Sequence, residues 1–284
     1  MNIKFKNPYY YIYVYELSAG EIWVNDVPLV NWKGVQTENG VFNGEIPINQ
    51  VVLENGTFQL ECRLMPRSNN KFLDLSKSPD IYTIGFKKRE VNNLKTKIDI
   101  SQEIENPYSK WNEQKKRMVN ETFTGLPIYI AKTSFEVTDL PFTLDGWQKS
   151  IDLSKLKEKD LLVDVIRYYR QIHSVMASHN VSKFLELSKE KMKLQEEAFY
   201  FTEERKRSFR EAAAQLFNQK LEILPLNVTD LKLQIMGYGK LVRLVRLDGS
   251  AALQYKSPNV EKQSNVEIDI KLHMRSEEKG LTII

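Results

Sequence analysis

The feature that most constrains this chain is a run of helical periodicity that begins at Glu158. From Glu158 to about His179 the sequence contains neither Gly nor Pro, and apolar residues recur at spacings of three and four. This spacing places them on one face of a helix, which is typical of a helix that buries one side. The apolar positions are Leu162, Val165, Ile166, Tyr169, Ile172, Val175 and Met176.

Two further helices are predicted directly after the first. The second covers Val181 to about Phe201, and the third covers Glu203 to Lys220. Thr202 has the side chain of an N-cap and is followed by two glutamates, whose charge suits the start of a helix. Asn180 can either end the first helix or cap the second. The second and third helices could also join across Thr202 into one bent rod.

The residues before the helical block are rich in strand signals. The clearest follows the Asn55-Gly56 turn, where apolar and polar residues alternate from Thr57 to Leu64, the period of a half-buried strand. Asn25-Asp26 indicates a hairpin turn, and Pro28 favours an edge strand. A short helix near Tyr108 to Met118 is the one possible exception. Many short strands separated by polar turns predict an antiparallel β-sandwich or barrel.

The residues after the helices again indicate strands. Leu231 to Met236 leads into Gly237-Tyr238-Gly239, which we interpret as a bend between two strands. Val266 to Met274 alternates strictly and is predicted to form one strand, with His273 on its polar face. Helices that precede a meandering antiparallel sheet predict an α+β unit in which the helices pack on a curved antiparallel sheet.

A chain of 284 residues exceeds the usual size of one domain. The strand pattern stops at Pro141 to Trp147, where Pro, Asp-Gly and Trp occur close together. We therefore predict a β-sandwich domain over residues 1–147 and an α+β domain over residues 148–284, which makes the whole chain α+β.

Within the first domain, the order of a strand ending in WVND, an apolar run, a loop and LENGTFQLECRL resembles the jelly-roll sandwiches of galactose-binding-like domains. The likeness covers roughly Trp23 to Leu64. Asp26 and Thr57-Phe58 depart from that family's pattern, and no ligand residue is matched. The resemblance therefore implies a fold only, and sugar binding cannot be carried over from it.

The second domain, from about Leu156 to Ile284, resembles the cone of nuclear-transport-factor-2-like proteins in the order of its elements. In that superfamily a curved sheet and helices can enclose a pocket. The superfamily includes both enzymes and binding proteins, so the resemblance implies a place to look for a site and leaves the function open.

Charge and cysteine content narrow the class of protein. The 41 basic and 37 acidic residues give a net charge of +4, a balance that argues against nucleic acid as a partner. The single cysteine, Cys62, excludes an internal disulfide framework. No membrane span or signal peptide is evident, so we expect a soluble, cytoplasmic protein.

Catalytic and metal signals are sparse. The histidines, His173, His179 and His273, do not have the spacing of a metal-binding motif on a helix. Neither a nucleophile elbow nor a Gly-rich nucleotide fingerprint occurs. The basic run from Glu204 to Arg210 is diluted by acidic neighbours and is interpreted as a solvated helix face. We therefore expect no metal and no cofactor.

The function predicted from these features is binding of a partner, most simply another protein, by a protein without catalytic machinery. One alternative is a small-ligand binder or enzyme that uses a pocket between the first helix and the C-terminal sheet. Its lining candidates are Tyr168, Tyr169 and His173. A further alternative is carbohydrate binding by the first domain, which predicts exposed aromatic side chains such as Trp23 or Trp32.

Overall fold

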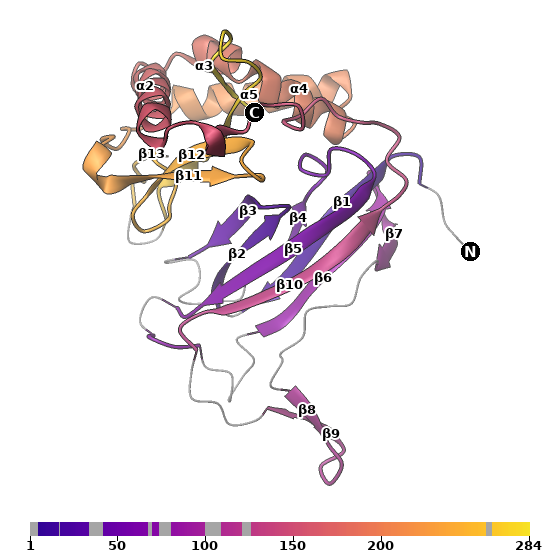
Figure 1. Cartoon of the computed structure of the whole chain (residues 1–284). Coiled ribbons are helices and arrows are strands. Elements are labelled where there is room, and N and C mark those ends of the chain that lie inside the picture. The colour runs from indigo at the N-terminus through magenta and orange to yellow at the C-terminus, as the bar shows by residue number, and fades with distance from the viewer. Residues whose placement is uncertain are drawn as a thin grey trace. The chain divides into compact units, whose positions relative to one another are not determined.

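The chain forms two compact units, Met1–Thr143 and Leu144–Ile284 (Figure 1). The computed structural model describes residues 5–16, 18–33, 42–67, 70–73, 81–99, 109–120, 126–259 and 263–284. The first unit is built from antiparallel sheets, and the second from helices packed with sheet. The predicted α+β class is confirmed.

Two four-stranded antiparallel sheets make up most of the first unit, with strand orders β4-β1-β6-β7 and β10-β5-β2-β3. The first sheet consists of β1 (Pro8–Glu16), β4 (Phe42–Pro47), β6 (Ile81–Glu90) and β7 (Asn93–Asp99). The second consists of β2 (Ala19–Val24), β3 (Val27–Trp32), β5 (Gly56–Met65) and β10 (Tyr129–Val137).

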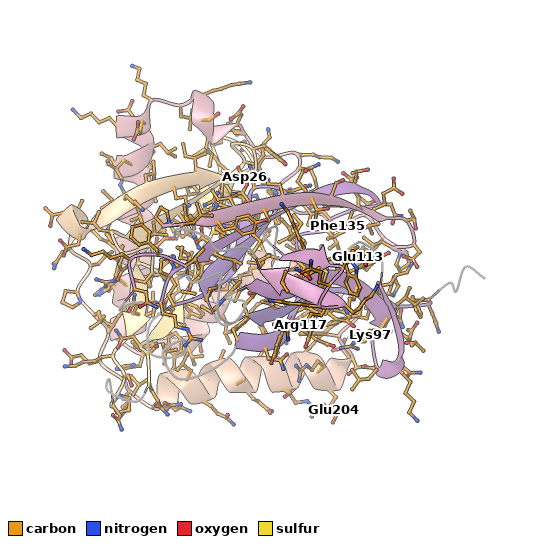
Figure 2. All side chains as sticks on the ribbon, turned by 90° about the horizontal axis from the view of Figure 1, so that it is seen from below. Asp26, Lys97, Glu113, Arg117, Phe135 and Glu204 are labelled. Carbon is orange, nitrogen blue, oxygen red and sulfur yellow. The ribbon has the colours of Figure 1, made fainter. Side chains whose placement is uncertain are left out.

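Stacked aromatic rings join the two sheets face to face. The ring centroids of Phe86 on β6 and Phe135 on β10 lie 3.8 Å apart. Phe135 (labelled in Figure 2) also stacks on Phe58 of its own sheet, and Phe86 stacks on Tyr10. All four rings are buried or nearly so. The alternation predicted for Thr57 to Leu64 therefore turns its apolar side toward the other sheet, as expected for a sandwich.

The hairpin turn between β2 and β3 is the predicted one. Asn25 and Asp26 (labelled in Figure 2) adopt positive φ angles of 46° and 62°, which is the backbone of the turn type that favours Asn and Asp. Asn25 also accepts the amide of Gln59 at 2.7 Å, which ties the turn to β5. Pro28 lies on β3, an edge strand, as its missing N–H predicts.

Asn49 holds the first strand in place from outside the sheet. Its side chain is fully buried, accepts the backbone amide of Tyr10 at 2.7 Å and donates to the carbonyl of Pro8 at 2.9 Å. The Asn49 amide thus supplies a hydrogen-bond acceptor and a donor to the backbone of β1. The side chain therefore satisfies polar groups that the sheet ladder does not reach.

The tyrosines of β1 do not lie on an edge strand. β1 lies between β4 and β6, and cationic side chains of β6 cover the tyrosine rings. The guanidinium of Arg89 lies 4.2 Å from the ring centroid of Tyr9, and the Lys87 ammonium lies 5.2 Å from that of Tyr13. Cation–π contacts therefore stabilise the aromatic face.

The segment considered for a short helix is a β-hairpin, formed by β8 (Ser109–Asn112) and β9 (Arg117–Asn120). Trp111 lies directly opposite Met118, and both side chains are about half exposed. Lys116 in the turn takes a φ of 49°, which allows the chain to reverse. Tyr108 falls outside the described residues.

In the second unit the helices gather on one side of the strands (Figure 1). The helices are α2 (Glu158–Ala177), α3 (Val181–Leu187), α4 (Lys189–Ala198) and α5 (Glu203–Asn218), with short 3-10 turns η1 (Leu153–Lys155) and η2 (Val228–Asp230). The main sheet has the order β11-β12-β15-β16, beside a two-stranded sheet β13-β14. The strands are β11 (Leu231–Met236), β12 (Leu241–Arg246), β13 (Leu253–Tyr255), β14 (Val266–Ile268), β15 (Leu272–Met274) and β16 (Leu281–Ile283).

The core of this unit lies between α2 and the main sheet. The helix buries one stripe of side chains at spacings of three and four: Leu161, Val165, Tyr169, Ile172 and Met176. They share a cluster with Val242, Leu272 and Ile283 from three strands of the sheet. The periodicity that begins at Glu158 thus marks the face that the sheet covers.

The second predicted helix is divided in two at Ser188. This residue ends α3 and begins α4, and its ψ angle of 7° lies outside the helical range. Its amide bonds to the carbonyls of Phe184 and Glu186. Thr202 caps α5 by accepting the amide of Arg205, and α5 is a separate helix that starts at Glu203. Asn180 caps α3 after His179 has turned the chain with a φ of 52°.

The strand predicted over Val266 to Met274 is also divided. β14 ends at Ile268, β15 begins at Leu272, and the two belong to different sheets. The carbonyl of Asp269 accepts from Lys191 on α4, and the carbonyl of Ile270 accepts from the Tyr169 hydroxyl on α2. Both carbonyls lie between the two strands and accept hydrogen bonds from side chains of helices. His273 consequently does not lie on a solvent face.

Gly239 fixes the bend between β11 and β12. Its φ is +87°, and a Cβ added there would lie 2.2 Å from the Asp152 carboxylate. Its carbonyl accepts the amide of Leu153 at 2.7 Å. This close approach ties the bend to η1 and requires a residue without a side chain.

Candidate functional site

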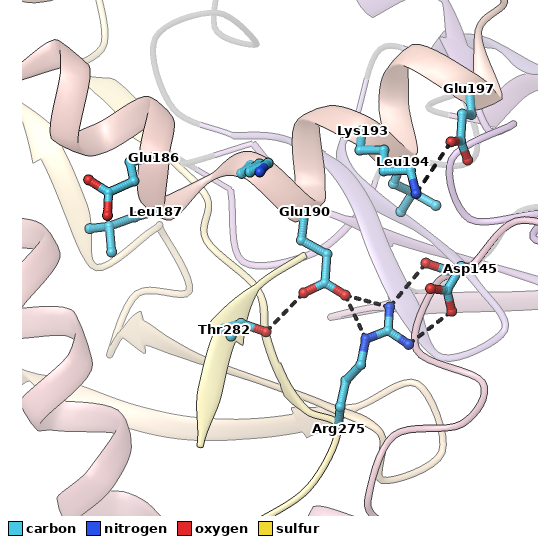
Figure 3. Close-up of a pocket in the computed structure, with 10 residues that line it drawn as sticks. Asp145, Glu186, Leu187, Glu190, Lys193, Leu194, Glu197, Arg275 and Thr282 are labelled. Carbon is cyan, nitrogen blue, oxygen red and sulfur yellow. Dashed lines mark hydrogen bonds and ion pairs between the residues drawn. The ribbon is translucent and has the colours of Figure 1, made fainter. Parts of the chain in front are cut away.

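A pocket of about 420 Å³ opens beside α4 and is here called the α4 pocket. All of its lining belongs to the second unit. Leu187 and Leu194 supply its apolar surface, and charged side chains surround them (Figure 3). The full lining is Asp145, Glu186, Leu187, Lys189, Glu190, Lys193, Leu194, Glu197, Arg275 and Thr282.

The centre of the pocket is an ion-pair network around Arg275. Its Nε atom donates to Glu190 Oε1 at 2.7 Å, a second guanidinium nitrogen donates to the same oxygen, and NH1 donates to Asp145 Oδ1 at 2.9 Å. Thr282 on β16 donates to Glu190 Oε2 at 3.2 Å. Figure 3 shows Glu190 pointing from α4 toward the guanidinium, with Asp145 on its far side. The network thus joins α4, the sheet and the first residues of the unit.

These contacts set the charge state of Glu190. Burial would raise the pKa of this carboxyl, but the hydrogen bond from Arg275 and the neighbouring His273 outweigh burial and hold the pKa below its usual value. Glu190 is therefore a carboxylate near neutral pH. Arg275 in turn has a raised pKa, because the pull of Glu190 and Asp145 outweighs its partial burial.

Behind Glu190 lies a buried histidine. His273 on β15 has no exposed surface, its Nε2 atom lies 3.2 Å from Glu190 Oε1, and its Nδ1 atom lies 2.8 Å from Ser150 Oγ. Burial lowers the pKa of His273 despite the adjacent Glu190 carboxylate. The Ser150 hydroxyl can donate to Nδ1 of a neutral ring, whereas the buried Nε2 lies close to Glu190 without forming a hydrogen bond.

The order Ser150, His273, Glu190 contains the residue types of a hydrolase triad. These three residues differ from a working triad because a substrate cannot reach the serine: Ser150 is only 3% exposed and His273 is fully buried. A nucleophile must reach its substrate. This row of three residues connects the segment before η1, through β15, to α4.

The residues predicted to line a pocket lie elsewhere on α2. Tyr169 is 1% exposed and donates its hydroxyl to the carbonyl of Ile270 at 2.5 Å. His173 is half-buried, with Nε2 3.0 Å from the carbonyl of Leu224. Tyr168 is half-buried, and its pKa is raised by burial and by the charge of Glu190. None of the three lines the α4 pocket, and their role in a ligand site stays a prediction.

The two indoles considered for carbohydrate stacking are buried. Trp32 is 1% exposed, donates to the carbonyl of Ser18 at 2.8 Å and stacks on Phe42. Trp23 is 5% exposed, with the Arg63 guanidinium 4.2 Å from its ring centroid. Neither ring has the exposure that the carbohydrate alternative requires. Trp32 packs between the two sheets, whereas Trp23 lies on the same sheet face as Glu61 and is covered by the Arg63 guanidinium.

Sequence reasoning missed the pocket residues for an identifiable reason. Four charged residues that line the pocket lie on α4: Lys189, Glu190, Lys193 and Glu197. In a sequence, such charges on a helix are typical of a face exposed to solvent. The partner of Glu190, Arg275, is 85 residues further along the chain. Asp145, which also pairs with Arg275, is 130 residues away from it in sequence. The helical spacing of the charges on α4 was the one local signal available.

Comparisons of the chain with protein-family models, with curated proteins and with solved structures gave no match. In the part of the chain that the structure describes, no helix is both long enough and apolar enough to cross a membrane. Within the same residues, no three side chains of His, Cys, Asp or Glu come together in a group that could hold a metal ion. The function must therefore be inferred from the geometry of the site.

Proposed function

We propose that this chain is a binding protein whose C-terminal unit receives a segment of another protein in the α4 pocket. The observation that supports this proposal is a small apolar surface, Leu187 and Leu194, set within charges of both signs. Interfaces between proteins share this arrangement of an apolar centre and a polar rim. A pocket of about 420 Å³ also falls within the range of sites that enclose a ligand group.

The rim charges define the kind of segment that fits. Lys189 and Lys193 offer cations, and Glu186 and Glu197 offer carboxylates, all on exposed positions of α3 and α4. A segment with an aliphatic side chain flanked by residues of opposite charge matches the leucines and both sets of charges. Rim charges of this kind mainly set specificity and the rate of association.

The inner polar groups favour recognition over catalysis. Glu190, Arg275 and Asp145 satisfy one another, so a substrate would have to break these bonds to reach them. Breaking a partly buried ion pair carries a large penalty. The charged groups on the floor of the pocket are therefore already paired, and a partner can bind against them without any catalytic step.

Peptide selection tests this function. A peptide library displayed on phage is panned against the full chain, and an enriched peptide is then measured by fluorescence anisotropy. We expect enriched peptides to carry an aliphatic residue between charged ones, and Leu187→Arg to weaken their binding at least about tenfold. Lys193→Glu should weaken acidic-flanked peptides selectively.

The matched control for Lys193→Glu is Lys159→Glu, which makes the same charge change at an exposed position of α2 outside the pocket. Its affinity for the peptide should equal that of the unaltered chain. Selection that yields no peptide, or peptides that bind Leu187→Arg as tightly as the unaltered chain, contradicts the proposal.

A second candidate function, hydrolysis, has one supporting observation, the row of Ser150, His273 and Glu190. A fluorophosphonate probe distinguishes the two candidates, because it labels an activated serine. The binding proposal expects no labelling of Ser150. Labelling that disappears in His273→Gln while the fold is retained would replace binding by an enzymatic function.

A further inference from the structure

A second cluster of charges lies on another side of α4, where β14 stops. Arg243 on β12 donates from Nε to Gln234 at 2.8 Å and from NH1 to Asp269 Oδ1 at 2.9 Å. Lys271 donates to the other oxygen of Asp269 at 2.5 Å, and Lys191 on α4 donates to the backbone carbonyl of Asp269 at 3.2 Å. We call these five residues the Asp269 cluster.

The Asp269 cluster holds more positive than negative charge. Three cations, Lys191, Arg243 and Lys271, meet one carboxylate, so the formal sum is +3 − 1 = +2. Arg243 is 8% exposed and the Lys271 side chain is 19% exposed, so this charge is withdrawn from much of its water. Unbalanced charge in a partly buried place is unfavourable unless an anion neutralises it.

The electrostatics of the individual groups agree with this excess. Burial and the charge of Lys271 lower the pKa of Lys191 to about 8, although Asp269 acts in the opposite direction. Burial would raise the pKa of Asp269, but Lys271 and Arg243 hold it well below its usual range. The cluster is therefore a region of positive potential around a carboxylate that stays ionised.

The cluster can be reached from solvent and is already ordered. The Asp269 side chain is 35% exposed and marks the accessible edge. Gln234 and Asp269 fix the Arg243 guanidinium in place. An ammonium group has three N–H donors, so Lys191 and Lys271 can donate to a ligand while they keep their bonds to Asp269.

We propose that the Asp269 cluster binds a phosphate group, free or as a monoester, with Lys191 and Lys271 donating to its oxygens. A phosphate carries about two negative charges near neutral pH and so balances the excess of +2. Lysine acts on phosphate as a point charge and needs no forked geometry. Bound phosphate would also stabilise the charged form of Lys191.

This site is separate from the α4 pocket. Lys189, Glu190 and Lys193 line the pocket, whereas Lys191 does not and donates instead to the carbonyl of Asp269. Loss of phosphate binding in a Lys191 variant therefore leaves the pocket residues unchanged, and the two proposals can fail independently.

Isothermal titration calorimetry on the full chain tests the site. Inorganic phosphate and glycerol phosphate are each titrated at about pH 7.5, where both are largely dianions, with chloride added to hold the ionic strength constant. We expect saturable one-to-one binding of at least one of them. Lys191→Met and Lys271→Met should each weaken it at least about tenfold, whereas Lys159→Met on the exposed face of α2 should not.

The ratio of the two affinities separates a free phosphate from a phosphate ester, and binding of either supports the site. Acetate that binds as tightly as phosphate overturns it, because a single negative charge does not balance +2. Absence of saturable binding by both phosphates also overturns it.

A second measurement keeps the test decisive if a lysine variant fails to fold. Lysines of the unaltered chain are labelled with carbon-13 at Cε during expression, and the Cε resonance of Lys191 is titrated by NMR. Added phosphate should move the midpoint of this titration to higher pH, because an anion favours the ammonium form. A midpoint that phosphate does not change contradicts the proposal.

Discussion

The Nε2 atom of His273 lies 3.2 Å from Glu190 Oε1, although the histidine comes from the interior of the sheet and the glutamate lines a pocket. The contact joins a residue without exposed surface to one that a partner can approach. Any change in the charge of His273 therefore alters the electrostatic potential at Glu190 and so in the α4 pocket.

The buried His273 should make the protein less stable as the pH falls. Burial lowers its pKa in the folded chain, whereas the unfolded value is about 6.5. Below about pH 6.5 the unfolded chain binds a proton that the folded chain does not, so the free energy of unfolding decreases as the pH is lowered. Urea unfolding between about pH 7.5 and pH 5.5 measures this decrease.

His273→Gln is the control for that experiment, since glutamine cannot titrate. Its stability should depend less on pH over the same interval. If the two chains show the same pH dependence, then His273 does not carry the linkage.

Gly239→Ala should destabilise the second unit strongly. A left-handed φ of +87° costs an L-residue about 1–2 kcal/mol. The added methyl also lies 2.2 Å from the Asp152 carboxylate. Gly280→Ala has a similar φ of +68° but meets no atom within 4 Å, so it isolates the backbone term. Chemical denaturation should give Gly239→Ala a clearly lower free energy of unfolding than Gly280→Ala. Equal values would show that the clash with Asp152 is relieved at no cost.

Phe135→Ala should lower the stability of the sandwich by about 3–5 kcal/mol, the usual loss for removing a buried aromatic ring. The ring is 3% exposed and bridges the two sheets through Phe86. Phe72→Ala makes the same change at a side chain that is 53% exposed and should stay within about 0.5 kcal/mol. Denaturant midpoints measure both, and a small loss for Phe135→Ala would mean that the sheets do not depend on this contact.

Asn49→Ala should cost about 2 kcal/mol, because it removes the acceptor of the buried Tyr10 amide and a donor to the carbonyl of Pro8. The exposed Asn43 on β4 supplies the comparison, since Asn43→Ala removes the same group from a solvated position. Hydrogen exchange at the Tyr10 amide gives a local readout. If the Tyr10 amide in Asn49→Ala stays as protected from exchange as in the unaltered chain, then the Asn49 side chain does not stabilise β1.

The sequence by itself determined the features that depend on neighbouring residues. Periodicity located α2 and the strand β5, and turn chemistry located the bend at Asn25 and Asp26, because backbone angles and one buried face follow from local residue types. The same local rules predicted that antiparallel strands precede the helices and that the helices need a sheet to cover their apolar face.

The tertiary structure alone decided what interrupts these patterns. The strand over Val266 to Met274 breaks because the carbonyls of Asp269 and Ile270 bond to side chains on α4 and α2, which are distant in sequence. That break creates the Asp269 cluster and places His273 beside Glu190. Hydrogen bonds and charges between remote residues have no periodic signature, so only the folded chain shows which polar residues meet.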